Sequence, residues 1–352
     1  MSVKIKVVRR LLKIKKEADL KKSNKTNFKS IYDVLEINDN WRNSPQVIKN
    51  IALKELTIES TQIKNVPCFL FKPNFKYKHF ANTPKTNEDI LFVYIHGGGF
   101  VNGFAEQGAY LIKAISRRIG CSALAINYTL SPEVTYPFAL NQIVDVYLEI
   151  IKNHKPSKII IGGESAGGNL CLTLLLKLKS LNIELPKMAI IASGFLDLTG
   201  SGVSYVTNAN TDVSLSGGQL SYMANAYLMG EKVKKVSVSE LKKPLVSPIF
   251  GDFSNFPPIF FNVCSDEILY SDTLTAYQKC KACHVKTKLV TNKNCFHGYM
   301  ALGDFFEEGK LVCNDAAKFI KSVFKLKTIN LIPERKSLKK QNKEAKQQNS
   351  NE

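Results

Sequence analysis

The fold of this chain is decided by a stretch that reads KIIIGGESAGG at residues 158–168. Its isoleucines favour a buried strand, and the residues from Ser165 to Leu181 favour a helix. The pentapeptide GESAG at residues 163–167 therefore lies on a turn between a strand and a helix. Small residues on both sides of Ser165 permit a sharp turn, which leaves the serine hydroxyl clear of the backbone. The pattern predicts a nucleophilic serine at the carboxyl end of a strand.

Apolar runs elsewhere in the chain alternate with helical patterns. Continuous apolar strands that alternate with helices are typical of a parallel sheet with helices on both faces, so the fold class is predicted to be α/β. The expected strands cover residues 56–58, 66–71, 90–95, 123–128, 158–161, 188–191, 258–263 and 285–290. The expected helices cover residues 106–119, 139–153, 165–181, 271–283 and 310–325.

Three segments break this alternation. Residues 199–243 are polar, rich in Ser and Asn, and contain a helical run at 220–229. We expect them to form an insertion that folds over the carboxyl edge of the sheet together with residues 1–50. The core is then formed by residues 51–198 and 244–330. The tail at 333–352 is rich in Lys, Gln and Asn, and its composition predicts disorder.

A glycine-rich loop, HGGGF at residues 96–100, follows the expected strand at 90–95. Glycines allow backbone N–H groups to point at one spot, so Gly97, Gly98 and Gly99 are expected to form an oxyanion hole with the N–H of Ala166. His96 and Glu164 border these groups and are expected to support them. A phosphate-binding loop is disfavoured because neither a Gly-Lys-Ser/Thr ending nor a G-x-G-x-x-G pattern is present. A turn that serves only chain reversal is the remaining alternative.

An activated serine needs a base and a carboxylate that orients the base. Of the five histidines, His297 follows the last expected strand and precedes the last expected helix, so it is the predicted base. The strand at 258–263 leads into the sequence Cys264-Ser265-Asp266-Glu267. Asp266 is the predicted acid, with Glu267 one residue away and Asp272 as further candidates.

These motifs resemble those of the hormone-sensitive-lipase-like esterases, which have the α/β-hydrolase fold. The resemblance covers about residues 55–325 and includes HGGGF at 96–100, GESAGG at 163–168, YTLSPE at 128–133 and SDEIL at 265–269. It implies that residues 1–50 and 199–243 form a helical cap over an acyl pocket. It also implies that Glu133 braces the glycine loop, although a carboxylate at a helix start explains Glu133 equally well.

The predicted activity is hydrolysis of short- to medium-chain acyl esters or lactones through an acyl-enzyme, with no metal or organic cofactor. Two alternatives use the same fold: an amide hydrolase and a ligand-binding protein without turnover. The string Cys280-Lys281-Ala282-Cys283-His284 matches a c-type haem attachment pattern and could suggest zinc. No second C-x-x-C accompanies it, so a coincidence on a helix surface is preferred.

The formal charge of +19 is concentrated at the two ends of the chain. Residues 1–29 hold eleven Lys or Arg and two acids, and residues 333–352 hold six and three, so the remaining residues hold about +7. A nucleic-acid partner is therefore not predicted. Residues 4–22 place Val7, Leu11, Ile14 and Ala18 on one helical face. This spacing predicts a helix that packs on the domain or, alternatively, a basic amphipathic helix on an anionic membrane surface.

Further expectations concern localisation and assembly. No secretory signal is visible, and no run approaches the ~18 apolar residues of a membrane span. Several of the eight cysteines lie in apolar stretches, as buried thiols do. A cytoplasmic protein with reduced thiols is predicted. An exposed last strand or helix could pair two copies into a homodimer.

Overall fold

The computed structural model describes residues 1–25, 55–74, 76, 87, 89–230 and 236–326 of the 352-residue chain. The predicted disordered tail at 333–352 and residues 26–50 of the first cap segment lie outside these ranges. The strands are β1 Leu56–Ile63, β2 Val66–Pro73, β3 Leu91–Ile95, β4 Ser122–Ile126, β5 Ile159–Glu164, β6 Met188–Ala192, β7 Ile259–Cys264 and β8 Thr287–Asn292. The α-helices are α1 Val3–Lys25, α4 Ala109–Ile119, α5 Phe138–Ile150, α6 Ala166–Ser180, α7 Ser204–Thr207, α8 Gly217–Met229, α9 Val238–Leu241, α10 Tyr270–Ala282 and α11 Glu307–Phe324.

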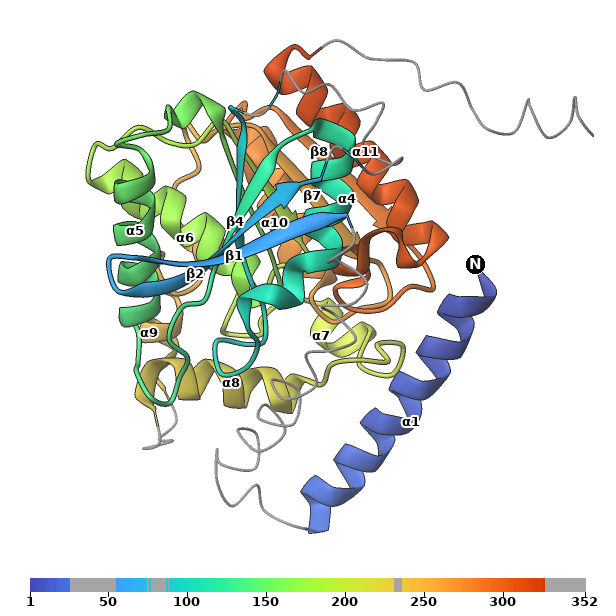
Figure 1. The fold of residues 1–352 in the computed structure, drawn as a ribbon. Helices are drawn as coiled ribbons and strands as arrows, with labels where there is room; N and C mark the ends of the chain where they lie inside the picture. Colours follow the sequence, from blue (N-terminus) through green and yellow to red (C-terminus); the bar gives the residue numbers. More distant parts are fainter. Residues whose placement is uncertain (26–54, 75, 77–86, 88, 231–235, 327–352) are drawn as a thin grey trace, which may run out of the picture.

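The described strands form one mostly parallel sheet in the order β1-β2-β4-β3-β5-β6-β7-β8. The pairs β1–β2 and β2–β4 are antiparallel, and all later pairs are parallel. The helices lie on both sides of this sheet (Figure 1). The prediction of an α/β fold with a mostly parallel sheet is confirmed. Strand β8 lies at one edge of the sheet, and the pairing of two copies there stays a prediction.

Alternating side chains of the central strands form two separate cores. Val93, Ile95 and Ile161 pack with residues of α5, α6 and α10 on one face. Phe92, Tyr94 and Ile160 pack with residues of α4 and α11 on the other face. These side chains are almost completely removed from water, which contributes about 1.5–3 kcal/mol for each large apolar residue. The two cores explain why the strands are continuous apolar runs rather than alternating ones.

The carboxyl ends of the parallel strands meet at one edge of the sheet. Ile95 of β3 pairs with Gly163 of β5, and Ala192 of β6 pairs with Glu164 of β5. Cys264 of β7 pairs with Asn292 of β8. Because these register positions are the last of their strands or next to the last, the loops that follow β3, β5, β6, β7 and β8 open at the same edge. This edge holds every residue that the sequence predicts for a serine nucleophile and its partners.

The segment predicted as a cap insertion, residues 199–243, packs against this edge through its described residues 199–230. Helix α8 starts at a capping box in which Ser216 and Gln219 bond each other's backbone N–H. Tyr227 of α8 stacks on Phe100 of the glycine loop with ring centroids 3.9 Å apart. Asn208, just after α7, donates to the backbone oxygens of Ser265 and Glu267 at 2.8 and 2.9 Å. Whether this segment acts as a cap over substrate stays a prediction.

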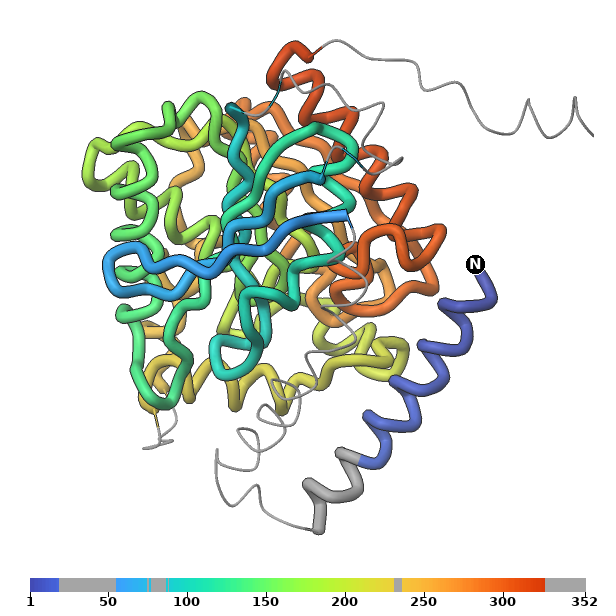
Figure 2. The backbone as a smooth tube through the Cα atoms, in the orientation of Figure 1, coloured from blue at the N-terminus to red at the C-terminus, as the bar shows by residue number. Residues whose placement is uncertain are grey.

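Helix α1 packs on the domain, but through a different face from the one predicted. Ile5 is fully buried, and Val8 and Leu12 pack against the core beneath α4 and α11. The predicted face is exposed instead: Val7, Leu11 and Ile14 keep 53, 59 and 55% of their surface. The helix runs along the outside of the body, drawn in blue in Figure 2. None of the described helices is both long enough and apolar enough to cross a bilayer.

Candidate active site

The turn between β5 and α6 holds Ser165 in an unusual conformation. Ser165 has φ 55° and ψ −120°, a region that non-glycine residues rarely occupy. Its N–H donates to the oxygen of Ala192 at 2.9 Å, and its own oxygen accepts from Phe195 at 3.0 Å. These two bonds attach the turn to the end of β6. The serine side chain is thereby presented at the amino end of α6, where the helix dipole favours negative charge.

The glycine loop that follows β3 has two residues with positive φ, Gly98 at 106° and Gly99 at 63°. A Cβ atom on Gly98 would lie 2.1 Å from the backbone oxygen of Asn102, so only glycine fits there. Within the described residues, the N–H groups of Gly98, Gly99 and Ala166 have no hydrogen-bond acceptor. Unpaired backbone donors at one spot can receive an oxyanion.

Gly97 requires a correction to the predicted oxyanion hole. Its N–H donates to Oε1 of Glu164 at 3.0 Å and is therefore already paired. Glu164 is buried, and burial raises the pKa of its carboxyl, while the charge of His297 and the bond from Gly97 act in the opposite direction. Glu164 thus joins the glycine loop to the turn that carries Ser165, and Gly97 acts in this link rather than as a free donor.

The glycine loop is held from behind by the segment at 127–131 and not by Glu133. His96 stacks on Tyr128 with ring centroids 4.2 Å apart, and the hydroxyl of Tyr128 donates to the oxygen of His96 at 3.0 Å. The N–H of Ser131 donates to the oxygen of Phe100 at 2.9 Å. Glu133 is exposed in the turn before α5, and in the described structure it makes no hydrogen bond to the loop. The role that the resemblance implies for Glu133 is therefore corrected.

The side chain of His297 is oriented by Glu267. The distance from Nδ1 of His297 to Oε2 of Glu267 is 2.6 Å. The second oxygen, Oε1, accepts from the hydroxyl of Ser193 at 2.7 Å and from the N–H of Cys264 at 2.6 Å. Glu267 keeps only 1% of its surface exposed. A buried carboxylate with both oxygens bonded holds the imidazole in one tautomer and leaves Nε2 free to accept a proton.

The predicted acid, Asp266, has different partners. Its Oδ2 accepts from the N–H of Asn294 at 3.0 Å and lies 3.4 Å from Nη1 of Arg9. Arg9 also donates to the backbone oxygen of Cys295. The prediction is wrong because successive residues of this turn point to opposite sides, so that Asp266 faces α1 while Glu267 faces the sheet edge. Asp272, the third candidate, accepts from the N–H groups of Leu196 and Asp197 instead.

A contact of the next residue, Gly298, places the loop of His297 beside the strand end that bonds Ser165. The N–H of Gly298 donates to Oγ of Ser193 at 3.3 Å, and Ser193 directly follows the β6 residue that bonds Ser165. Burial lowers the pKa of His297, but the bond and charge of Glu267 together with the charges of Glu164 and Asp212 outweigh burial. The net pKa of His297 is raised. The imidazolium form is therefore well stabilised among these carboxylates.

Sequence reasoning missed two supporting residues, Ser193 and Asp212. Ser193 follows β6 just as Ser165 follows β5, so the argument from strand ends could have found it. Asp212 accepts from the N–H of Ile268 at 2.8 Å and thereby holds the turn that carries Glu267. It lies in the polar insertion, where no motif pointed to it.

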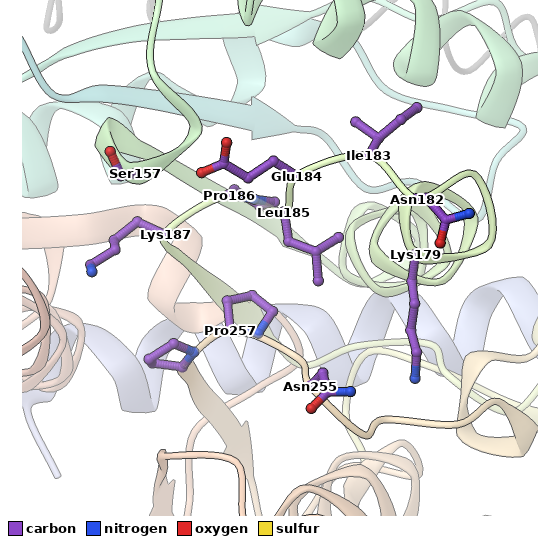
Figure 3. A pocket seen from close by; sticks show the side chains of 11 residues that line it. Ser157, Lys179, Asn182, Ile183, Glu184, Leu185, Pro186, Lys187, Asn255 and Pro257 are labelled. Carbon is purple, nitrogen blue, oxygen red and sulfur yellow. The ribbon is translucent and has the colours of Figure 1, made fainter.

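The remaining features of the described structure lie apart from this site. No group of three or more His, Cys, Asp or Glu in the described ranges could hold a metal ion. A surface hollow of about 720 Å³ lies at the amino ends of β5, β6 and β7, on the opposite edge of the sheet (Figure 3). Lys179, which lines this hollow, donates hydrogen bonds from its amine to the carboxylate of Asp252 and to the backbone oxygen of Ser254. This hollow therefore takes no part in the chemistry of Ser165.

Comparisons with known proteins show the family of this chain. A family described by its α/β-hydrolase fold matches residues 92–301. An esterase of Acinetobacter venetianus is 32% identical over 234 residues, which are 66% of this chain and 75% of that protein. An acetyl-hydrolase of Streptomyces hygroscopicus is 26% identical over 240 residues, or 68% of this chain and 78% of the relative.

Solved structures extend the likeness to the whole fold. The crystal structure of an esterase from the bacterial hormone-sensitive lipase family superposes with a TM-score of 0.72 at 23% identity. It covers 92% of this chain and 99% of its own. The predicted resemblance is confirmed. The chain belongs to a family with the α/β-hydrolase fold and is a hydrolase, and its relatives include an esterase, an acetyl-hydrolase and the hormone-sensitive lipase of Bos taurus, which is 33% identical over 118 residues, or 32% of this chain and 16% of that protein.

Proposed function

We propose that the protein hydrolyses carboxylic esters with Ser165 as nucleophile, His297 as general base and Glu267 as the acid. The observation that carries the proposal is the 2.6 Å contact between His297 Nδ1 and Glu267 Oε2 beside the strained turn of Ser165. A carboxylate on Nδ1 leaves Nε2 as the acceptor for the serine proton. The N–H groups of Gly98, Gly99 and Ala166 receive the oxyanion.

The reaction proceeds in two halves that mirror each other. Ser165 Oγ forms a bond to the ester carbonyl carbon while His297 takes its proton, and the tetrahedral oxyanion is held by the backbone donors. The C–O bond to the alcohol then breaks, and His297 returns the proton to the leaving oxygen. Water attacks the acyl-enzyme in the same way, and the acid and free Ser165 are formed. This sequence needs no metal or organic cofactor.

The substrate class proposed is a short- to medium-chain acyl ester or lactone. Phe100 and Tyr227 stack beside the glycine loop, and a Cβ on Gly99 would lie 2.2 Å from Sδ of Met223, so α8 sits directly over the loop. Because these side chains lie so near the oxyanion donors, they limit the depth of the space that an acyl chain can occupy. The acetyl-hydrolase named among the relatives supports a small acyl group.

The test is hydrolysis of p-nitrophenyl esters from acetate to decanoate by the full chain and by Ser165→Ala. We expect the variant to lose about 10⁶-fold in kcat, as removal of a catalytic serine does elsewhere. A fluorophosphonate probe should label the wild type and a Ser265→Ala control, but not Ser165→Ala. Unchanged hydrolysis by Ser165→Ala would refute the mechanism. A labelled enzyme that cleaves p-nitroanilides faster than esters would favour an amide hydrolase, and absent labelling would favour a ligand-binding protein.

A further inference from the structure

The outer face of α1 carries an apolar stripe that no described residue covers. Val3, Val7, Leu11 and Ile14 keep 76, 53, 59 and 55% of their surface exposed. Their spacing of four, four and three residues places them on one side of a helix. We call these four residues the outer stripe. Exposed apolar residues scattered singly are ordinary, but a row along one helix marks an interaction surface.

The surroundings of the outer stripe are strongly basic. Helix α1 contains ten Lys or Arg and two acidic residues. Exposed cations of α1 that make no ion pair with any described carboxylate include Lys6, Arg10, Lys13 and Lys15. Such a surface repels a second copy of itself and attracts an anionic one. An apolar row flanked by cations has the composition of helices that lie in the plane of a membrane interface.

The inner face of α1 is attached to the domain, so the stripe is presented outward in a fixed orientation. Ile5 is fully buried on this inner side. Ser2 bonds both oxygens of Glu308, and Arg9 pairs with Asp266. Lys16 donates to the backbone oxygens of Ala209 and Asp212 at 3.1 and 2.6 Å. These anchors occupy one side of the helix, and the outer stripe occupies the other.

We propose that the outer stripe of α1 docks the protein on an anionic lipid bilayer surface. The apolar side chains enter the headgroup region, and the flanking cations pair with anionic lipids. Because Arg9 on the inner face contacts the loops that carry Glu267 and His297, docking brings the carboxyl edge of the sheet close to the lipid. This last consequence rests on the proposed ester hydrolysis, whereas the docking itself does not.

The experiment measures binding separately from catalysis. The full chain and the Ser165→Ala variant are sedimented with vesicles of phosphatidylcholine alone and of phosphatidylcholine mixed with equal phosphatidylglycerol. Both proteins should bind the anionic vesicles, bind the neutral ones far less, and dissociate as sodium chloride is raised. Equal binding by Ser165→Ala separates this test from the catalytic proposal.

Two sets of variants test the surface itself. The combination Val7→Ser, Leu11→Ser and Ile14→Ser should weaken vesicle binding at least about tenfold. The combination Lys6→Gln, Arg10→Gln and Lys13→Gln should weaken binding and flatten its salt dependence. The matched control replaces three similarly exposed apolar residues elsewhere, Leu181→Ser, Val238→Ser and Leu311→Ser, and should bind as the wild type does. Thermal unfolding of each variant checks that the fold is retained.

Several results would overturn the proposal. The first is a wild-type protein that does not bind anionic vesicles at low salt. The second is a control variant that loses as much vesicle binding as the stripe variant. The third is a stripe variant whose vesicle binding is undiminished. A dimer that the stripe variant dissociates, without any vesicle binding by the wild type, would assign the surface to a second copy. Binding to an oligonucleotide that depends on the cations alone, again without vesicle binding, would assign it to nucleic acid.

Discussion

Two turns at the same edge of the sheet present the central residues of the proposed site, and they differ in what determines them. The turn at residues 163–167 is shaped by its own backbone, because Ser165 needs its unusual φ and its neighbours must be small. The turn at residues 264–268 is shaped by partners that are distant in sequence. Asp266 reaches Arg9 and Asn294, and Glu267 reaches Ser193 and His297. Local geometry is readable from a short motif, whereas the choice between two adjacent carboxylates is made by tertiary contacts.

Within this comparison, the largest effect is expected from a substitution that distinguishes the two adjacent carboxylates. Glu267→Gln should lower kcat by about 10⁴-fold, the loss seen when a triad acid becomes an amide. The N–H of Cys264 must find an acceptor at Oε1, so the amide oxygen occupies that position and the NH₂ group faces Nδ1 of His297. The imidazole proton then moves to Nε2, which can no longer accept the proton of Ser165.

Asp266→Asn is the matched control for this comparison. An asparagine keeps an oxygen for the N–H of Asn294 and loses only part of its attraction to Arg9. We expect kcat to fall less than about tenfold. The measurement is steady-state hydrolysis of p-nitrophenyl butyrate by both variants. If Asp266→Asn were the more damaging of the two, the assignment of Glu267 as the acid would be wrong.

The second prediction concerns the stability of the turn at Ser165. A Cβ on Gly163 would lie 2.5 Å from the carbonyl carbon of Gly167 and 2.6 Å from the oxygen of Ile95, both backbone atoms that cannot yield. Gly163→Ala should therefore lower the free energy of unfolding by about 3 kcal/mol or more. Gly217→Ala, at the start of α8, meets nothing within 4 Å and should raise it by about 0.4–1 kcal/mol.

Urea denaturation followed by circular dichroism measures both changes. Opposite signs for two glycine-to-alanine substitutions would show that the turn tolerates no side chain at that place, not that alanine is harmful in general. A stable Gly163→Ala variant would mean that the turn is not as tight as the contacts indicate.

These differences explain which parts were predictable from the sequence. Most strands are predicted to within about three residues at each end because apolar runs of this length have few alternatives, whereas β1 extends to Ile63, beyond the predicted 56–58. Helix α1 is predicted too, but not its packed face, because Val7, Leu11 and Ile14 form a row as apolar as Ile5, Val8 and Leu12. Periodicity identifies faces and does not say which one meets the core.

The errors inside the site have the same origin. Gly97 has the same sequence context as Gly98 and Gly99, but the buried carboxylate of Glu164 takes its N–H. Glu133 follows a recognisable motif, yet its side chain points to solvent while Tyr128 and Ser131 hold the loop. In both cases the motif located the segment correctly, and tertiary contacts decided which of its groups take part.

The third prediction uses the raised pKa of His297. The base must be neutral to accept the serine proton, so kcat/KM should rise with pH through a midpoint above the ordinary histidine value of about 6.5. In Glu267→Gln, burial still lowers the pKa of His297 while its main opposing partner is gone. The midpoint of the residual activity should therefore move to lower pH. An unchanged midpoint would mean that Glu267 does not set the titration of His297.

The smallest expected effect tests how far the turn at residues 264–268, which carries Glu267, depends on α1. Arg9 and Lys16 both lie on the inner face, but only Arg9 touches the segments that carry Glu267 and His297. Arg9→Gln should lower kcat by roughly fivefold, the equivalent of about 1 kcal/mol for one partly buried charged contact. Lys16→Gln removes the same charge from the same helix but reaches this turn only through Asp212, so it should lower kcat less than Arg9→Gln while lowering thermal stability to a similar extent. A larger loss of kcat in Arg9→Gln would tie α1 to the geometry of the turn at residues 264–268, because a general loosening of the helix would affect both variants equally.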